Sequence, residues 1–204
     1  PTAHPWSLAA AHVALGFAHL TRGDLEAARS VLERGLGRAR DLNITAWLPM
    51  LSCQLGLVYA RQGRGPEGLA LLEDGVERAV ALAIRSRHAL RLAWLAEALL
   101  RAKRAEDARA AALRALDAAR AHGERGYEGW VLRMLGEVAL AGGETSTAFE
   151  YYRAALDVAA RLGMRALDAH TWHGMGRAAA GVGRSTAPGA KGGRAAPRFP
   201  HPRL

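Results

Sequence analysis

The sequence predicts an all-α solenoid, a stack of antiparallel helix hairpins, and three observations carry this prediction. First, 45 of the 204 residues are alanine, the residue with the highest helix propensity. Second, a leucine followed by a small residue recurs with a fixed spacing of 40 residues, and a period of this length is typical of repeat architectures. Third, the apolar residues between these pairs follow the period of a helix and not the alternation of a strand.

The 40-residue repeat is clearest at the small residue of each pair. These residues are Gly16, Gly56, Ala96, Gly136 and Gly176. Each follows a leucine, or a methionine in the fifth repeat. A second set of positions lies seven residues later, and it comprises Gly23, Gly63, Lys103, Gly143 and Gly183. A third set lies after these turn positions, and in repeat one it comprises Ala28, Leu32, Gly35 and Leu36. The agreement of all these positions predicts one structural unit for each repeat.

Each repeat is expected to form two helices. The small residue lies in the first helix, helix A, and lets the second, helix B, approach closely. Seven residues later a glycine ends helix A in the left-handed conformation, and the third set then forms one face of helix B. The expected A and B pairs are 5–22 and 24–41, 45–62 and 66–82, 86–102 and 105–121, 127–142 and 145–162, with a fifth helix A at 166–181. Pro49 and Pro66 are expected in first turns, where proline is tolerated.

This pattern resembles the tetratricopeptide repeat (TPR) family. The match is best in repeat four, through Leu135-Gly136, Gly143, Ala148 and Tyr152, and weaker in repeat three, where Lys103 replaces the turn glycine. The resemblance covers residues 1–183 and implies a right-handed superhelical solenoid of about four and a half repeats. The long period is similar to that of kinesin light chain, of Leu-Gly-Asn-repeat adaptors, and of bacterial signalling proteins in which an ATPase or adenylate cyclase module precedes the repeats. The Ala-, Arg- and Gly-rich composition favours the bacterial group, and the start at Pro1 indicates a fragment.

The repeat pattern stops after Gly183, and residues 184–204 are predicted to form a disordered basic tail. This segment is rich in proline and glycine, contains four basic residues and no acidic one from residue 185 onwards, and cannot bury enough apolar surface to offset its chain entropy. Two explanations remain open: a truncated or frame-shifted gene, or a tail that binds nucleic acid or acidic membranes. In both cases the helix A of repeat five is expected to expose an apolar flank.

The net charge of +9 does not by itself predict nucleic-acid binding. Residues 1–184 contain 24 basic and 19 acidic residues, and 26 of the 28 basic residues of the chain are arginine. Abundant arginine, alanine and glycine together indicate GC-rich codon usage, which disfavours nucleic acid as a partner. The sequence has no uninterrupted apolar stretch of membrane-spanning length and no signal peptide. We therefore predict a cytoplasmic protein with no membrane partner.

The motifs that suggest enzyme chemistry lie in sequence contexts that do not support it. The segment 63–68 reads G-x-G-x-x-G, but it lies between two predicted helices, whereas a dinucleotide site needs a preceding strand. The single cysteine, Cys53, excludes an internal disulfide and a cysteine-based zinc site. His170 and His173 are close enough to share a metal, but only Asp168 is near as a third ligand. The sequence predicts no enzyme activity, no cofactor and no metal.

The TPR resemblance implies that the A helices line a concave groove that binds a partner. Carried over by position, the groove residues are Phe17, Gln54, Leu57, Arg61, Trp94, Glu97, Arg101, Trp130, Arg133, Glu137, His173 and Arg177. Tryptophan and arginine are frequent interface anchors, although Trp94 and Trp130 can equally pack between hairpins. The lysine and asparagine clamp of the chaperone-binding TPR proteins is absent at the matching positions.

These observations predict a protein- or peptide-binding scaffold or sensor module from a larger bacterial signalling or regulatory protein. Its partner would be a protein or peptide in the groove, and an ATPase or cyclase effector domain would lie outside this chain. Two alternatives remain: a nucleic-acid-associated protein that uses the basic tail, and a sensor that holds a small ligand or a peptide signal inside the superhelix.

Overall fold

A computed structural model describes residues 4–185 of the chain, with side chains described to residue 180. This part contains helices and no strand, which confirms the all-α fold class. The helices are α1 (Pro5–Arg22), α2 (Leu25–Asp41), η1 (Thr45–Trp47), α3 (Leu48–Arg61), α4 (Gly65–Ala81), α5 (His88–Arg101), α6 (Ala105–Ala121), α7 (Arg125–Ala141), α8 (Thr145–Leu162) and α9 (Arg165–Ser185). Every predicted helix is present. The predicted disordered tail lies outside the described residues, except for residues 184 and 185, which end α9.

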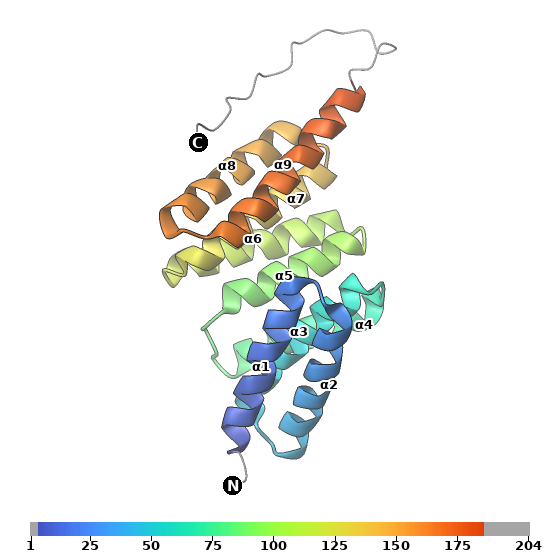
Figure 1. The fold of residues 1–204 in the computed structure, drawn as a ribbon, viewed down its shortest axis with the longest axis vertical. Helices are drawn as coiled ribbons and strands as arrows, with labels where there is room; N and C mark the ends of the chain where they lie inside the picture. The colour runs from blue at the N-terminus through green and yellow to red at the C-terminus, as the bar shows by residue number, and fades with distance from the viewer. Residues whose placement is uncertain (1–3, 186–204) are drawn as a thin grey trace.

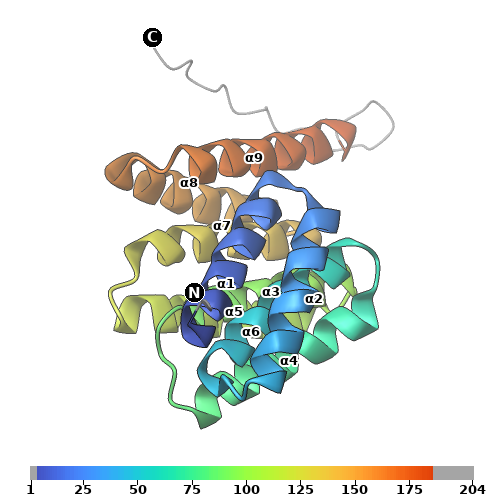
Figure 2. The same cartoon turned by 60° about the horizontal axis from the view of Figure 1, so that its bottom comes forward.

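The helices form two layers. The A helices (α1, α3, α5, α7 and α9) contact one another in succession, and each B helix (α2, α4, α6 and α8) packs mainly against the A helices before and after it. Figures 1 and 2 show the hairpins stacked from α1 and α2 at one end to α9 at the other. The core runs between the layers as a nearly continuous chain of apolar contacts. This arrangement confirms the predicted solenoid of antiparallel hairpins.

The close approach of the two helices in a hairpin depends on the small residue of helix A. A Cβ on Gly16 would lie 2.3 Å from Leu32, and one on Gly136 would lie 2.5 Å from the ring of Tyr152. In repeat two a Cβ on Gly56 would lie 2.7 Å from the carbonyl oxygen of Gly68. We call the surface that each of these glycines leaves open on helix A the glycine notch. A side chain or the backbone of helix B fills the notch in these three repeats.

The turn that ends helix A uses the left-handed backbone conformation at the predicted position. Gly23, Gly63 and Gly143 have φ values of 80°, 85° and 79°. Lys103 occupies the same position in repeat three with a φ of 62°. In repeat one the N–H of the next residue, Asp24, donates to the carbonyl of His19 over 3.0 Å, which closes the C-terminal cap. The same conformation is costly for lysine because its Cβ crowds the backbone.

A second left-handed position, at the end of helix B, also repeats every 40 residues. It is occupied by Asn43, Ala83, Gly123 and Gly163, with φ values between 52° and 65°. The sequence analysis did not identify this position because only two of the four residues are glycine. Glycine and asparagine adopt this conformation readily, so only at Ala83 does the hairpin geometry impose it on a residue that does not favour it.

Two A helices begin later than expected. The expected helix 45–62 opens with the short turn η1, and α3 starts at Leu48, with Pro49 in its first turn. Pro66 is likewise in the first turn of α4, so both proline predictions are confirmed. Helix α5 starts at His88 because Arg87 adopts a left-handed φ of 57°. The Arg87 N–H donates to Glu124 Oε1 over 2.9 Å, which ties this turn to the following repeat.

The strain at Lys103 yields a first prediction. We expect Lys103→Gly to raise the free energy of unfolding by about 1 kcal/mol, because glycine adopts the left-handed conformation without a steric penalty. Chemical denaturation measures this change. Lys103→Ala is the matched control, since it removes the same charge but keeps the strained Cβ. A Lys103→Gly variant no more stable than Lys103→Ala would contradict the prediction.

The glycine notch yields a second prediction. Gly56→Ala adds a methyl group between the backbones of α3 and α4, and we expect it to lower the free energy of unfolding by about 1–3 kcal/mol. Gly37→Ala is the control, because a Cβ at this helical residue meets nothing within 4 Å. Alanine is the better helix former, so the control is expected to be neutral or up to about 1 kcal/mol more stable. Equal effects of the two substitutions in denaturation experiments would disprove the role of the notch.

Candidate functional site

The A-helix layer carries a pocket between α1, α3 and α5. Its volume is about 380 Å³, and its lining includes Val13, Phe17, Met50, Gln54, Leu90 and Trp94. The rings of Phe17 and Trp94 meet with centroids 6.3 Å apart. Trp94 is 6% exposed, while Phe17 is 39% exposed. Trp94 therefore belongs to the floor of the pocket and Phe17 to its rim.

Two buried polar atoms in the pocket lining have no hydrogen-bond partner among the described residues. They are Oε1 of Gln54, whose side chain is 1% exposed, and Nε1 of Trp47. An unsatisfied buried polar group costs about 1–3 kcal/mol. The pocket wall is mainly apolar, and two of its residues each hold a covered polar atom without a partner among the described residues.

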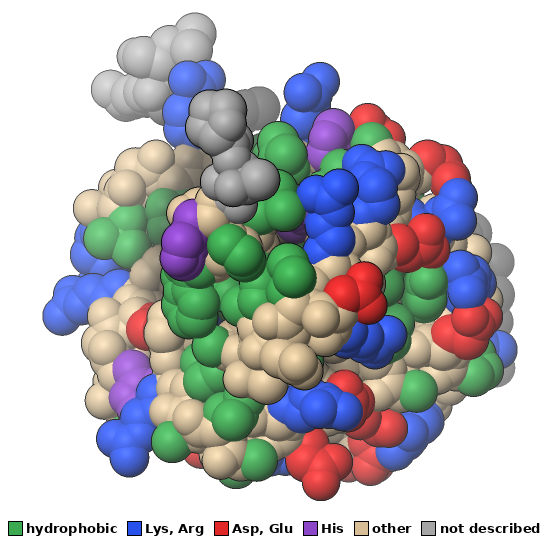
Figure 3. Space-filling model, turned by 90° about the horizontal axis from the view of Figure 1, so that it is seen from below, with side chains coloured by type: hydrophobic (Ala, Val, Ile, Leu, Met, Phe, Trp, Pro, Cys, Tyr) green, Lys and Arg blue, Asp and Glu red, His purple; other side chains and the backbone are tan. Residues whose placement is uncertain are grey.

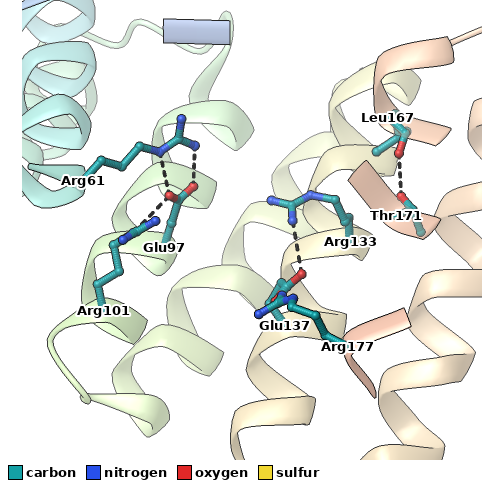
Figure 4. Close-up of polar contacts among 8 residues, drawn as sticks. All are labelled: Arg61, Glu97, Arg101, Arg133, Glu137, Leu167, Thr171 and Arg177. Carbon is teal, nitrogen blue, oxygen red and sulfur yellow. Dashed lines mark hydrogen bonds and ion pairs between the residues drawn. The ribbon is translucent and has the colours of Figure 1, made fainter. Parts of the chain in front are cut away.

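Beyond the pocket, the A-helix layer carries two glutamates that each bind two arginines (Figure 4). Glu97 on α5 accepts hydrogen bonds from Nε and Nη2 of Arg61 on α3, over 2.8 and 2.9 Å, and from Nε of Arg101 over 3.3 Å. The Glu97 side chain is 15% exposed. The bidentate contact with Arg61 fixes α3 to α5 with the geometry that arginine and carboxylate favour.

The second cluster lies one repeat later, and its cross-helix arginine comes from the following A helix instead of the preceding one. Glu137 on α7 accepts from Arg133 over 3.4 Å on its own helix and from Arg177 on α9. The Nε of Arg133 is buried without a partner, and its guanidinium carbon lies 5.7 Å from the centroid of the Trp130 ring. Four arginines face two glutamates in the two clusters together. This part of the surface therefore keeps an excess of positive charge.

The charges within the first cluster stabilise one another. Burial alone would raise the pKa of Glu97, but the hydrogen bond and charge of Arg61, and then the charges of Arg101 and Arg133, lower it below its ordinary value. Burial would lower the pKa of Arg61, and the hydrogen bond and charge of Glu97 reverse this effect and raise it. Both groups are therefore ionised at neutral pH.

The structure brings most of the predicted groove residues onto one layer, at different depths. Phe17, Arg101, His173 and Arg177 are exposed, and Arg61, Glu97, Trp130, Arg133 and Glu137 are partly buried. Gln54 and Leu57 are 1% and 0% exposed. Leu57 lies beneath the surface, so the proposed site below does not include it. Trp130 packs against the ring of His170, with centroids 5.5 Å apart.

The pocket lining includes residues outside the predicted groove, among them Trp47, Arg87 and Tyr127. Trp47 lies in η1, which the apolar period assigns to an ordinary helix. Arg87 lies in the turn before α5, and its left-handed conformation brings it to the pocket. No pattern in the sequence distinguishes these positions, because their place depends on how α3, α5 and α7 stack.

The other motifs considered for chemistry have structural roles in the described residues. Burial raises the pKa of the Cys53 thiol to about 12, so the thiolate needed for a nucleophile is not formed at neutral pH. The segment 63–68 forms the turn between α3 and α4 and the first residues of α4. Among residues 4–180 no three histidine, cysteine or acidic side chains gather into a metal-binding group. In this part of the chain no helix is long and apolar enough to span a membrane.

The ion pair between Arg61 and Glu97 yields a third prediction. Because the pKa of Glu97 is lowered in the folded state, its contribution to stability is present above the ordinary carboxyl pKa and is lost as the pH falls through the lowered value. We expect Glu97→Gln to reduce the free energy of unfolding by roughly 1–3 kcal/mol at pH 7.

The difference between this variant and the unchanged chain should shrink as the pH falls below about 4.5, the ordinary pKa of the group. Denaturation at a series of pH values measures it. Glu150→Gln is the control, because Glu150 is exposed and makes no ion pair in the described part. A difference that does not depend on pH would exclude the ion pair as its source.

Comparison with known proteins gives one family match. Residues 88–161 match the family model of the tetratricopeptide repeat. No curated protein sequence matches the chain. The solved structures that are similar include the TPR-like repeats of a kinesin light chain from Podospora anserina, with a TM-score of 0.63, 17% identity and 90% coverage of both chains.

Two further solved structures are regulatory proteins. One is a signal-transduction ATPase with numerous domains (STAND) and a tetratricopeptide repeat sensor from Pyrococcus horikoshii, with a TM-score of 0.61 and 17% identity. The match covers 84% of this chain but 26% of that one. The other is a plasmid-encoded Rap conjugation gene regulator in complex with the Phr* peptide, with a TM-score of 0.62, 14% identity, and coverage of 85% and 53%. At these identities the structures establish the shared fold alone.

Proposed function

We propose that this chain, whose residues 88–161 are tetratricopeptide repeats within a TPR-like solenoid, binds an extended peptide segment of another protein on its A-helix layer. The proposed site is the pocket between α1, α3 and α5, continued by the clusters around Glu97 and Glu137. The pocket would take an apolar side chain of the peptide, and the clusters would bind its polar groups. In this role the chain is a scaffold or sensor and not a catalyst.

The observation that carries the proposal is the apolar pocket itself, with Trp94 in its floor and two lining residues, Gln54 and Trp47, that hold unpartnered polar atoms. Gln54 Oε1 accepts a hydrogen bond and Trp47 Nε1 donates one, and neither has a partner among the described residues. A peptide group offers the complementary N–H and C=O. Both atoms are covered in the free chain, so a peptide that inserts an apolar side chain beside Trp94 would satisfy them through a shift of the Gln54 and Trp47 side chains.

The peptide class of ligand has support from the similar structures. The Rap regulator is solved with a bound peptide, as its description states. We propose further that this chain is the sensor region of a larger signalling protein, as the repeats are in the STAND ATPase. An ATPase or cyclase effector, the cytoplasmic location, and the division into a repeat domain of residues 1–183 and a basic tail remain parts of this proposal.

The clusters do not favour nucleic acid as the ligand. Phosphate binding uses arginines that are free to contact the backbone of the nucleic acid, whereas Arg61 and Arg177 are held by Glu97 and Glu137. An apolar pocket has no role in binding phosphate groups. A peptide, in contrast, places an apolar side chain in the pocket and polar groups on the clusters.

Panning a displayed library of random peptides on the immobilised chain tests the proposal. We expect selected peptides to lose at least about tenfold in affinity with Trp94→Ala, since a buried aromatic anchor contributes that much or more. Arg133→Ala is expected to weaken binding of the same peptides. Leu113→Ala is the control, because this leucine is 42% exposed on the B helix α6 and should leave binding unchanged.

A second variant separates binding from folding. Gln54→Leu replaces the unpartnered amide with an apolar group of similar size, so we expect no loss of stability but weaker binding of the selected peptides. If the library yields no specific peptide, or if selected peptides bind Trp94→Ala and Gln54→Leu as tightly as the unchanged chain, the proposed site is wrong.

A further inference from the structure

Among the described residues, nothing fills the glycine notch of α9. Helix α9 is the A helix of repeat five and ends the described stack (Figures 1 and 2). A Cβ on Gly176 would meet nothing within 4 Å, whereas a Cβ on Gly16, Gly56 or Gly136 would lie within 3 Å of helix B. The same register position is thus filled in three repeats and, within the described part of the chain, empty in the fifth.

The free face of α9 also carries an exposed tryptophan. Trp172 is 51% exposed and precedes Gly176 by four residues, so the two lie on one face, one turn apart. Gly174 faces the opposite way, where a Cβ would lie 2.9 Å from Tyr152 and from Glu137. Leu167, Thr171 and Met175 are buried. The helix therefore packs with one face on α7 and α8 and leaves the Trp172 and Gly176 face open.

The filled notches show what the open one accepts. In each of the three repeats the residue 16 positions after the glycine lies on the antiparallel helix B, and it contacts the notch as Leu32, Leu72 or Tyr152. Tyr152 is the informative case, because its aromatic ring lies directly against Gly136. A notch of this kind therefore accepts a large apolar or aromatic side chain from an antiparallel helix.

We propose that two copies of this chain pair through α9 about a two-fold axis, with Trp172 of each copy in the notch at Gly176 of the other. A two-fold interface requires that if one residue contacts a second, the second contacts the first in the partner copy. Two antiparallel helices related by an axis near residue 174 satisfy this rule. Trp172 and Gly176 lie two residues on either side of that point.

The pairing continues the hairpin interface that the chain already uses within its repeats. The α9 helix of the second copy would take the place that helix B takes in repeats one, two and four. Each copy contributes both a protruding side chain and a notch, so one face of one helix supplies all that the interface needs. Burying two half-exposed tryptophans supplies the apolar contact that drives such association. This inference concerns α9 and is independent of the proposed peptide site.

Sedimentation equilibrium of the complete 204-residue chain, over micromolar to submillimolar concentrations, tests the pairing. We expect a monomer–dimer equilibrium. Trp172→Gly leaves the notch unfilled, and Gly176→Trp places two tryptophans against each other, so each should weaken dimerisation by about tenfold or more. The double variant with both substitutions exchanges the two groups and should restore the dimer.

Two controls separate this contact from general adhesion. Trp6→Ala removes a tryptophan that is 49% exposed at the other end of the stack, and Gly37→Trp adds one at an open helical glycine. Neither should change dimerisation. Circular dichroism of each variant reports whether the helical fold is retained.

Three outcomes would overturn the proposal. They are a monomer at every concentration, a dimer that both single substitutions leave unchanged, and a double variant that does not recover dimerisation. The test also covers the other possible occupant. If removal of residues 186–204 converts a monomer into a dimer, that segment occupies the notch in the complete chain. The proposal is then wrong for the complete chain.

Discussion

The rest of the structure depends on the crossing of helix A and helix B at a residue that is glycine or, in repeat three, alanine. In repeat two the contact is reciprocal, because a Cβ on Gly56 would strike the carbonyl of Gly68 and a Cβ on Gly68 would strike the carbonyl of Gly56. Such a crossing fixes which face of helix A meets helix B. The opposite face must then form the A-helix layer, and the hairpin can stack only through its remaining sides. One steric constraint, applied every 40 residues, thus sets both the core and the candidate site.

The polar clusters serve the stacking and the proposed site together. The pair of Arg61 and Glu97 joins α3 to α5, and the pair of Arg177 and Glu137 joins α7 to α9. Each glutamate also binds an arginine of its own helix, Arg101 or Arg133. A partner that supplied a carboxylate would compete with these glutamates for their arginines. Binding at the clusters would therefore act on the contacts that hold successive repeats together, which is the coupling that a sensor needs.

The two ends of the solenoid differ from its middle because each lacks a neighbour on one side within the described residues. The leucine before the small residue is 3%, 8% and 2% exposed in repeats two to four, but Leu15 is 53% exposed in repeat one. Figure 3, which views the end that carries the N-terminus, shows hydrophobic side chains gathered over part of this surface beside a band of mixed charge. At the other end the open feature is the notch at Gly176. In a fold built by repetition, the unfilled positions at the ends offer surfaces for association.

The sequence by itself determined the repeat, the helices and the turn at the end of helix A, because these depend on interactions within one hairpin. The spacing of Gly16, Gly23 and Leu32 is sufficient to place them. Only the tertiary structure decided which residues of one repeat meet those of the next. Arg61 binds Glu97 and Arg177 binds Glu137 across 36 and 40 residues, Leu57 is buried where a groove position was predicted, and Trp47 enters the pocket from a turn. These outcomes depend on the angle at which hairpins stack. That angle arises from the packing of whole helices against one another, and the apolar period of a single helix does not predict it.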